Sequence, residues 1–231
     1  MIKSNYIDKA DWDDPKKTEA REQSIILAYQ NYFNKTSIPK NKQYWTMCGS
    51  HFNNNGKIDG ELGQLVQSNL ITPDQFHGVD INADIIKSNK KYYPDVSWYQ
   101  NDFIEAMKNS YINNSFNPAI INCDNVRMPK NAVKYLKKLL LFIDNNFFDE
   151  LLLVANLMLT NPYRQKVESS GEEVIDKLIN KYAFPDHWTI DSQYYKYSGT
   201  GKRSRTLMGS FIFVKQKHEK IKFTKGRKLK I

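Results

Sequence analysis

From Gln43 onward, short apolar runs alternate with amphipathic stretches, and this alternation restricts the possible folds more than any other feature of the sequence. Strands that alternate with helices form parallel β-α-β units with right-handed crossovers. The chain therefore has an α/β fold, with helices on both faces of a mostly parallel sheet. The periodicity predicts strands at 43–48, 76–80, 96–99, 118–123 and 148–159, and helices at 60–69, 83–92, 103–109, 130–145 and 172–182.

The last two predicted strands, 188–197 and 206–215, have no helix between them. A glycine-containing connection joins them, so we expect antiparallel neighbours. Residues 43–215 should form a single Rossmann-like, three-layer domain whose seven-stranded sheet has an antiparallel last strand. An N-terminal arm and a helix over 15–34 occupy residues 1–42, and a basic tail occupies 216–231.

Most of the positive charge lies at the C-terminal end. The chain carries a net charge of +9, and Lys215 to Ile231 contribute seven lysines and one arginine against one glutamate, which is +7. Such a tail can contact nucleic acid or simply keep the protein in solution, and both interpretations stay open. No apolar run approaches the roughly 18 residues that span a bilayer, and no export signal is visible. We expect a cytoplasmic protein without a membrane partner, in an oligomeric state that the sequence leaves unknown.

Two cysteines are too few for a disulfide framework, so Cys48 and Cys123 should be reduced. They end neighbouring central strands, and we expect their side chains to lie close together beside the floor of the ligand site. The four histidines are scattered and give no zinc spacing. The sequence therefore predicts no metal site.

Polar residues follow the first two predicted strands. In an open parallel sheet the ligand binds outside the carboxyl ends of the strands. Gly49, next to Ser50, would let the backbone pass close to a ligand because glycine has no Cβ. Asp80 could accept hydrogen bonds from the hydroxyls of a ribose, and Ile81 could contact a base.

Similar residues follow the third predicted strand and end the fourth. Asp102 could accept a hydrogen bond from an adenine amino group while Phe103 or Ile81 covers the ring. Asp124 or Asn122 would face the molecule that reacts with the cofactor. Structural roles compete with these, because strand-end aspartates often cap the following helix and Phe103 could belong to the core.

The order and spacing of these residues resemble class I S-adenosylmethionine-dependent methyltransferases, over about residues 43–215. The resemblance implies S-adenosylmethionine as cofactor, held by Gly49, by Asp80 and by Asp102 with Phe103, while Asp124 orients the acceptor. The family's first turn reads acid-x-Gly-x-Gly-x-Gly. Here residues 46–52 read Thr-Met-Cys-Gly-Ser-His-Phe, with one glycine.

A second basic cluster favours an anionic methyl acceptor such as RNA. Lys202, Arg203 and Arg205 lie between the last two strands and would overhang the cofactor site if the sixth strand runs parallel to the others. A solvated loop tip is the alternative. A non-catalytic, nucleic-acid-binding module with this fold remains a second hypothesis, favoured by the single-glycine turn. A dehydrogenase is disfavoured because no G-x-G-x-x-G follows the first strand.

Overall fold

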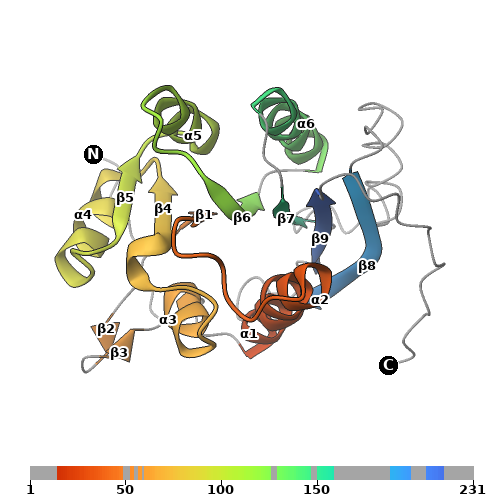
Figure 1. The fold of residues 1–231 in the computed structure, drawn as a ribbon, viewed down its shortest axis with the longest axis horizontal. Helices are drawn as coiled ribbons and strands as arrows, with labels where there is room; N and C mark the ends of the chain where they lie inside the picture. The colour runs from red at the N-terminus through yellow and green to blue at the C-terminus, as the bar shows by residue number, and fades with distance from the viewer. Residues whose placement is uncertain are drawn as a thin grey trace.

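A seven-stranded sheet forms the centre of the molecule (Figure 1). The computed structural model describes residues 15–48, 53–54, 57–58, 60–125, 129–146, 150–158, 188–198 and 207–215. The sheet has the order β5-β4-β1-β6-β7-β9-β8, and a separate antiparallel pair joins β2 (Asn53–Asn54) to β3 (Lys57–Ile58). The strands of the large sheet are β1 (Gln43–Met47), β4 (Phe76–Asp80), β5 (Ser97–Gln100), β6 (Pro118–Asn125), β7 (Leu151–Met158), β8 (Trp188–Ser198) and β9 (Leu207–Lys215).

The sheet is parallel except at β9. The strands β5, β4, β1, β6 and β7 pair in parallel, and β9 lies antiparallel between β7 and β8. Because β8 is antiparallel to β9, it runs in the same direction as the first five strands. The predicted fold class is therefore confirmed. It also follows that Ser198, which pairs with Leu207, lies at the carboxyl edge of the sheet.

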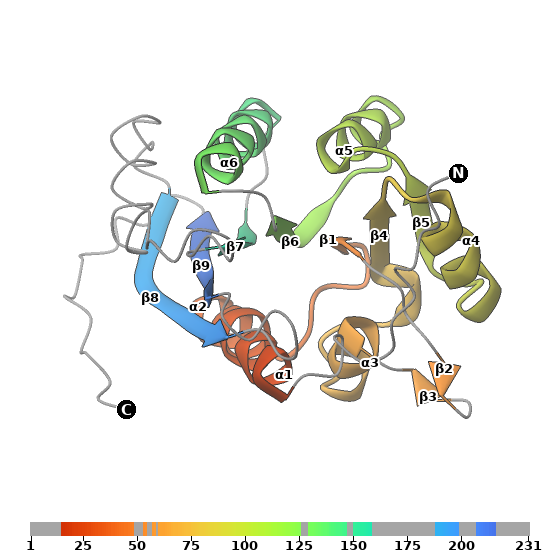
Figure 2. The same cartoon turned by 180° about the vertical axis from the view of Figure 1, so that it is seen from behind.

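Helices cover both faces, as Figures 1 and 2 show from opposite sides. One face carries α5 (Phe103–Ile112) and α6 (Pro129–Asn145). The other carries α3 (Gly60–Gln67), α4 (Ala83–Tyr92) and an N-terminal helical segment. The bounds of β4 and α4 agree with those predicted, whereas α5 runs three residues further than its predicted end at Asn109. The helix predicted over 172–182 lies outside the described residues.

Alternation along β1 explains how the sheet supports two cores. Tyr44 and Trp45 are both fully buried, but they belong to different hydrophobic clusters. Tyr44 stacks on Phe76 on the face of α3 and α4, with ring centroids 5.5 Å apart, and Trp45 packs on the face of α5 and α6. Successive side chains of a strand point to opposite faces, so both faces must be apolar to be covered by helices.

The same alternation separates the two cysteines. Both are buried and neither forms a disulfide, as predicted for reduced thiols. The expectation that their side chains meet is wrong, because Cys48 belongs to the cluster under α3 and α4, whereas Cys123 belongs to the cluster under α5 and α6. The Sγ atom of Cys123 lies 3.6 Å from the Sδ atom of Met47 instead.

The N-terminal helical segment has a wide turn at its centre. It consists of α1 (Pro15–Arg21), a π-helical turn η1 (Glu22–Leu27) and α2 (Ala28–Phe33), where the sequence predicted one regular helix. The π-helical turn packs on β7, β8 and β9. Insertions of this kind are frequent near functional sites. No helix in the described ranges is both long enough and apolar enough to cross a membrane.

Candidate functional site

The sheet reverses its strand order around β1. From β1 the chain proceeds outward through β4 and β5 on one side, and then through β6 and β7 on the other. This reversal defines the crevice where open α/β sheets bind ligands. Asp80 ends β4, and Asp124 lies one residue before the end of β6. The two aspartates therefore stand at the carboxyl ends of the two strands that flank β1. Gly49 and Ser50, which follow β1, lie outside the described residues.

Asp80 is not the cap of the helix that follows it. Asn82 caps α4, since its Oδ1 atom accepts a hydrogen bond from the backbone N–H of Asp84 at 2.9 Å. Asp80 accepts a hydrogen bond from the N–H of Asn82 at 2.8 Å. Burial raises the pKa of Asp80, and the backbone N–H groups of Asn82 and Ile81 oppose this shift. The side chain of Ile81 is 76% exposed, so a carboxylate and a bare apolar side chain lie next to each other at this strand end.

Asp102 and Phe103 have the structural roles that the sequence left open. Asp102 caps α5 by accepting hydrogen bonds from the N–H groups of Ile104 and Glu105, and it also accepts one from the hydroxyl of Tyr135 at 3.2 Å. Phe103 is 2% exposed and packs in the core with α6. The ring of Phe103 therefore has no face open to a ligand. Contact of Asp102 with a cofactor remains a prediction.

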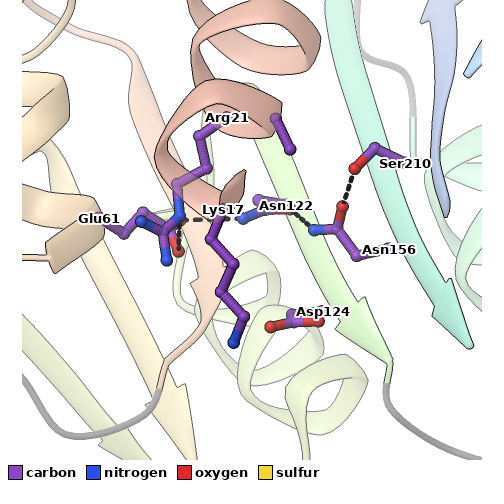
Figure 3. Close-up of a pocket in the computed structure, with 8 residues that line it drawn as sticks. Lys17, Arg21, Glu61, Asn122, Asp124, Asn156 and Ser210 are labelled. Carbon is purple, nitrogen blue, oxygen red and sulfur yellow. Dashed lines mark hydrogen bonds and ion pairs between the residues drawn. The ribbon is translucent and has the colours of Figure 1, made fainter. Parts of the chain in front are cut away.

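A polar cavity of about 20 Å³ lies beneath α1 (Figure 3). Its volume corresponds to about one water molecule. The cavity brings together one helix, the start of α3 and three neighbouring strands, β6, β7 and β9. Its walls are Lys17, Ala20, Arg21, Glu61, Asn122, Asp124, Asn156 and Ser210. Figure 3 shows the side chains of Lys17 and Arg21 reaching from α1 toward the strands.

A chain of hydrogen bonds crosses the floor of this cavity. The hydroxyl of Tyr44 and the Nδ2 atom of Asn122, at 3.0 Å, both donate to Oε1 of Glu61. The Nδ2 atom of Asn156 donates to Oδ1 of Asn122 at 2.8 Å, and the hydroxyl of Ser210 donates to Oδ1 of Asn156. Glu61 also faces Arg21, with 3.9 Å between Oε2 and Nε. The polar groups that the fold buries here are thus paired with one another.

One oxygen of Asp124 is an exception. Its Oδ1 atom is buried and has no hydrogen-bond partner within the part of the chain that the structure describes. Burial is the main cause that raises the pKa of Asp124; Lys17 and Arg21 oppose it, and Glu61 adds to it. A buried acceptor without a partner costs free energy, so its retention requires an explanation. The arrangement can accept a hydrogen bond from a small donor group.

The sequence named only two members of this cavity, Asp124 and Asn122. It missed Lys17, Arg21 and Glu61, whose helices gave no sign of facing the sheet edge. Asn156 and Ser210 did carry a signal in the sequence, because each is a polar residue within a largely apolar strand. The structure buries both, at 8% and 1% exposure. Lys202, Arg203 and Arg205 lie outside the described residues. Among the residues that are described, no cluster of histidine, cysteine and acidic side chains could hold a metal ion.

Comparison with solved structures links this topology to methyltransferases. The N-methyltransferase NodS from Bradyrhizobium japonicum WM9 superposes with a TM-score of 0.51 and 11% sequence identity, over 89% of this chain and 99% of that one. SMU.776, a putative methyltransferase crystallised with SAH, also gives a TM-score of 0.51, with 10% identity over 84% of this chain and 49% of that one. A further match with the same TM-score is a putative SAM-dependent methyltransferase from Streptococcus mutans. At such identities the likeness shows a common fold.

Sequence comparison gives a weaker result. No protein-family profile matches the chain. An asparagine–tRNA ligase from Azobacteroides pseudotrichonymphae is 26% identical over 149 residues, which are 63% of this chain and 29% of the ligase. The chain thus corresponds to under a third of that protein. The strand order, the antiparallel β9 and the structural neighbours together show that this chain has the class I S-adenosylmethionine-dependent methyltransferase fold.

Proposed function

We propose that the protein is an S-adenosylmethionine-dependent methyltransferase. The observation that carries the proposal is the pair of strand-end carboxylates beside β1, with Asp80 next to an exposed apolar side chain and Asp124 with an unpartnered oxygen. The cofactor would supply a methyl group that its sulfonium already activates. Catalysis then consists mainly of holding two reactants in line, which needs little acid–base chemistry. SMU.776, a structural neighbour crystallised with SAH, the demethylated product, supports this choice of cofactor.

Asp80 would bind the ribose end of the cofactor. Its second carboxylate oxygen can accept hydrogen bonds from a diol, and the exposed side chain of Ile81 offers apolar surface to the adjoining base. Asp102 would accept a hydrogen bond from the adenine amino group in addition to capping α5. Gly49 and Ser50 would let the cofactor approach the turn after β1. Phe103 would support this site from the core, without touching the ligand.

Asp124 would orient the methyl acceptor. Its unpartnered Oδ1 atom can accept a hydrogen bond from an amine or a hydroxyl, which places the lone pair of the nucleophile toward the cofactor. When bound, S-adenosylmethionine would supply the methyl group and keep the electron pair of the broken bond on sulfur. Asp124 would hold the acceptor in place, and Asp124 or water would take the proton that the acceptor loses.

An anionic acceptor such as RNA fits the charge distribution. Because β8 runs parallel to the central strands, it ends at the same sheet edge as Asp80 and Asp124. Lys202, Arg203 and Arg205 follow that end within eight residues and could bind phosphates. The basic residues after β9 start from the opposite edge. For this reason we assign the substrate contact to the β8–β9 connection and not to the tail.

Calorimetric titration with S-adenosylmethionine and with S-adenosylhomocysteine tests the proposal. We expect binding that Asp80→Ala weakens at least about 100-fold, because two hydrogen bonds to a charged acceptor are each worth about 1.5–3 kcal/mol. Asp74→Ala is the matched control, since Asp74 lies two residues before the start of β4, at the opposite end of the strand from Asp80. Wild-type protein that binds neither compound would refute the proposal and favour the non-catalytic module. RNA binding that does not weaken as salt rises would refute the phosphate contact.

A further inference from the structure

Glu61 contacts both the floor of the cavity, which the strands form, and its roof, which α1 forms. It comes from the first turn of α3 and is only 8% exposed. Its Oε1 atom receives hydrogen bonds from β1 and β6, and its Oε2 atom faces Arg21 of α1. Both side chains of the ion pair with Arg21 are nearly buried, at 12% and 9% exposure, so solvent screens the pair little. A single carboxylate thus joins three elements that are distant in sequence.

The charge of Glu61 sets the direction of the hydrogen-bond chain on the cavity floor. An ionised carboxylate only accepts hydrogen bonds, so Asn122 must turn its NH2 group toward Glu61. The carbonyl oxygen of Asn122 then faces β7, where only the NH2 group of Asn156 can pair with it. The oxygen of Asn156 is left to accept from Ser210. Each amide orientation follows from the one before it, starting at Glu61.

Glu61 also holds the cavity roof. Arg21 is the last residue of α1, directly before the π-helical turn that packs on β7, β8 and β9. Lys17 lies one turn earlier on the same helix and also lines the cavity, and its positive charge lowers the pKa of Asp124 against the effect of burial. An ion pair at Arg21 therefore holds α1, and with it Lys17, over the cavity (Figure 3).

We propose that Glu61 is a positioning residue, which orients the amides of the cavity floor and holds α1 over Asp124. Glu61 would act on the reacting groups only through Asn122 and Arg21. This role in methyl transfer rests on the proposed function, whereas the orientation of the floor and the roof does not require a cofactor.

Three variants of the full chain separate the two effects. Arg21→Gln removes the contact with the roof and leaves the bonds of Glu61 to Tyr44 and Asn122 in place. Glu61→Gln removes the negative charge from both contacts. Because a neutral amide can donate as well as accept, it no longer forces Asn122 into one orientation. Glu105→Gln is the matched control, since Glu105 also lies in the first turn of a helix but pairs with Lys108 at an exposed site.

Two measurements report on the roof and the floor. Backbone hydrogen exchange in α1 and η1 should accelerate at least about tenfold in Arg21→Gln and in Glu61→Gln, and stay unchanged in Glu105→Gln. The side-chain amide resonances of Asn122 and Asn156, observed with asparagine-selective ¹⁵N labelling, should shift in Glu61→Gln alone. The hydrogen bonds among the described residues connect Asn156 to Glu61 through Asn122, so a shift at Asn156 reports transmission along this chain.

Unchanged Asn156 resonances in Glu61→Gln, or unchanged exchange of α1 in Arg21→Gln, would overturn the proposal. Should Glu61→Gln fail to fold, exchange in Arg21→Gln still decides the role of the ion pair. Titration of the wild type with S-adenosylhomocysteine distinguishes failure of the proposed methyltransferase function from failure of the positioning role of Glu61. Absence of binding refutes the methyltransferase function, whereas the exchange rates and amide resonances test Glu61 independently.

Discussion

Replacing Asp124 by asparagine should make the protein more stable, although Asp124 is the residue proposed to orient the acceptor. The Oδ1 atom of Asp124 is buried with no hydrogen-bond partner among the described residues, and burial raises the pKa of its carboxyl group. An unsatisfied buried polar group costs about 1–3 kcal/mol, and Lys17 and Arg21 offset part of this cost. Asp124→Asn keeps the shape of the side chain and still buries a polar oxygen, but it removes the negative charge that burial disfavours. We expect a gain of about 1–2 kcal/mol at pH 7.

The sign of the pH dependence follows from the raised pKa. The folded state holds the proton of Asp124 more tightly than the unfolded state, so wild-type stability falls as pH rises through the folded-state pKa. The advantage of Asp124→Asn should therefore be larger at pH 7 than at pH 4. Urea titrations at both pH values measure this difference. In thermal melts it corresponds to about 2–8 °C for a chain of this length.

Asp144→Asn provides the comparison. The carboxylate of Asp144 accepts a hydrogen bond from Nε1 of Trp188 at 2.6 Å and pairs with Lys215 at 3.5 Å. The same substitution should therefore destabilise the protein at this site, by about 1–3 kcal/mol. If Asp124→Asn and Asp144→Asn lower stability by similar amounts, the lack of a hydrogen-bond partner does not make the charge of Asp124 unfavourable. That result would refute the prediction.

Two further predictions concern β4. Burial lowers the pKa of His77 to about 4 from the usual 6.5, so the unfolded state binds more protons than the folded state between these pH values. Lowering the pH through this range should therefore cost the wild type about 3 kcal/mol of stability, which His77→Phe should retain. Equal losses of stability in both proteins would contradict this. Gly78→Ala should destabilise by about 1–3 kcal/mol, because its Cβ would come within 2.3 Å of the Trp98 ring, which a hydrogen bond to the carbonyl of Tyr93 holds in place. Denaturation of Gly78→Ala with and without Trp98→Phe checks this, since the smaller ring should recover part of the loss.

Local patterns in the sequence determined the order and type of the elements. The β-α alternation predicted β4 and α4 with the bounds that the structure has, and the helix-free connection before β9 predicted its antiparallel pairing. Such patterns suffice because the period of an apolar run and the turn residues beside it are properties of a few neighbouring residues. The rule that ligands bind at carboxyl strand ends also directed attention to Asp80 and Asp124.

Only the tertiary structure decided which face each side chain takes and which distant groups meet. The sequence could not tell that Asp102 caps α5 while Asn82 caps α4 in place of Asp80, since both aspartates occupy the same kind of strand end. The sequence put Cys48 and Cys123 on adjacent strands, but it did not reveal that they face opposite sides of the sheet. A shift of one residue in strand register reverses the side on which a side chain lies. The cavity beneath α1 joins Arg21 to Glu61 and Asn122 to Ser210, pairs that lie 40 and 88 residues apart. Their meeting in one cavity depends on how helices pack on a twisted sheet, and no local pattern in the chain encodes that packing.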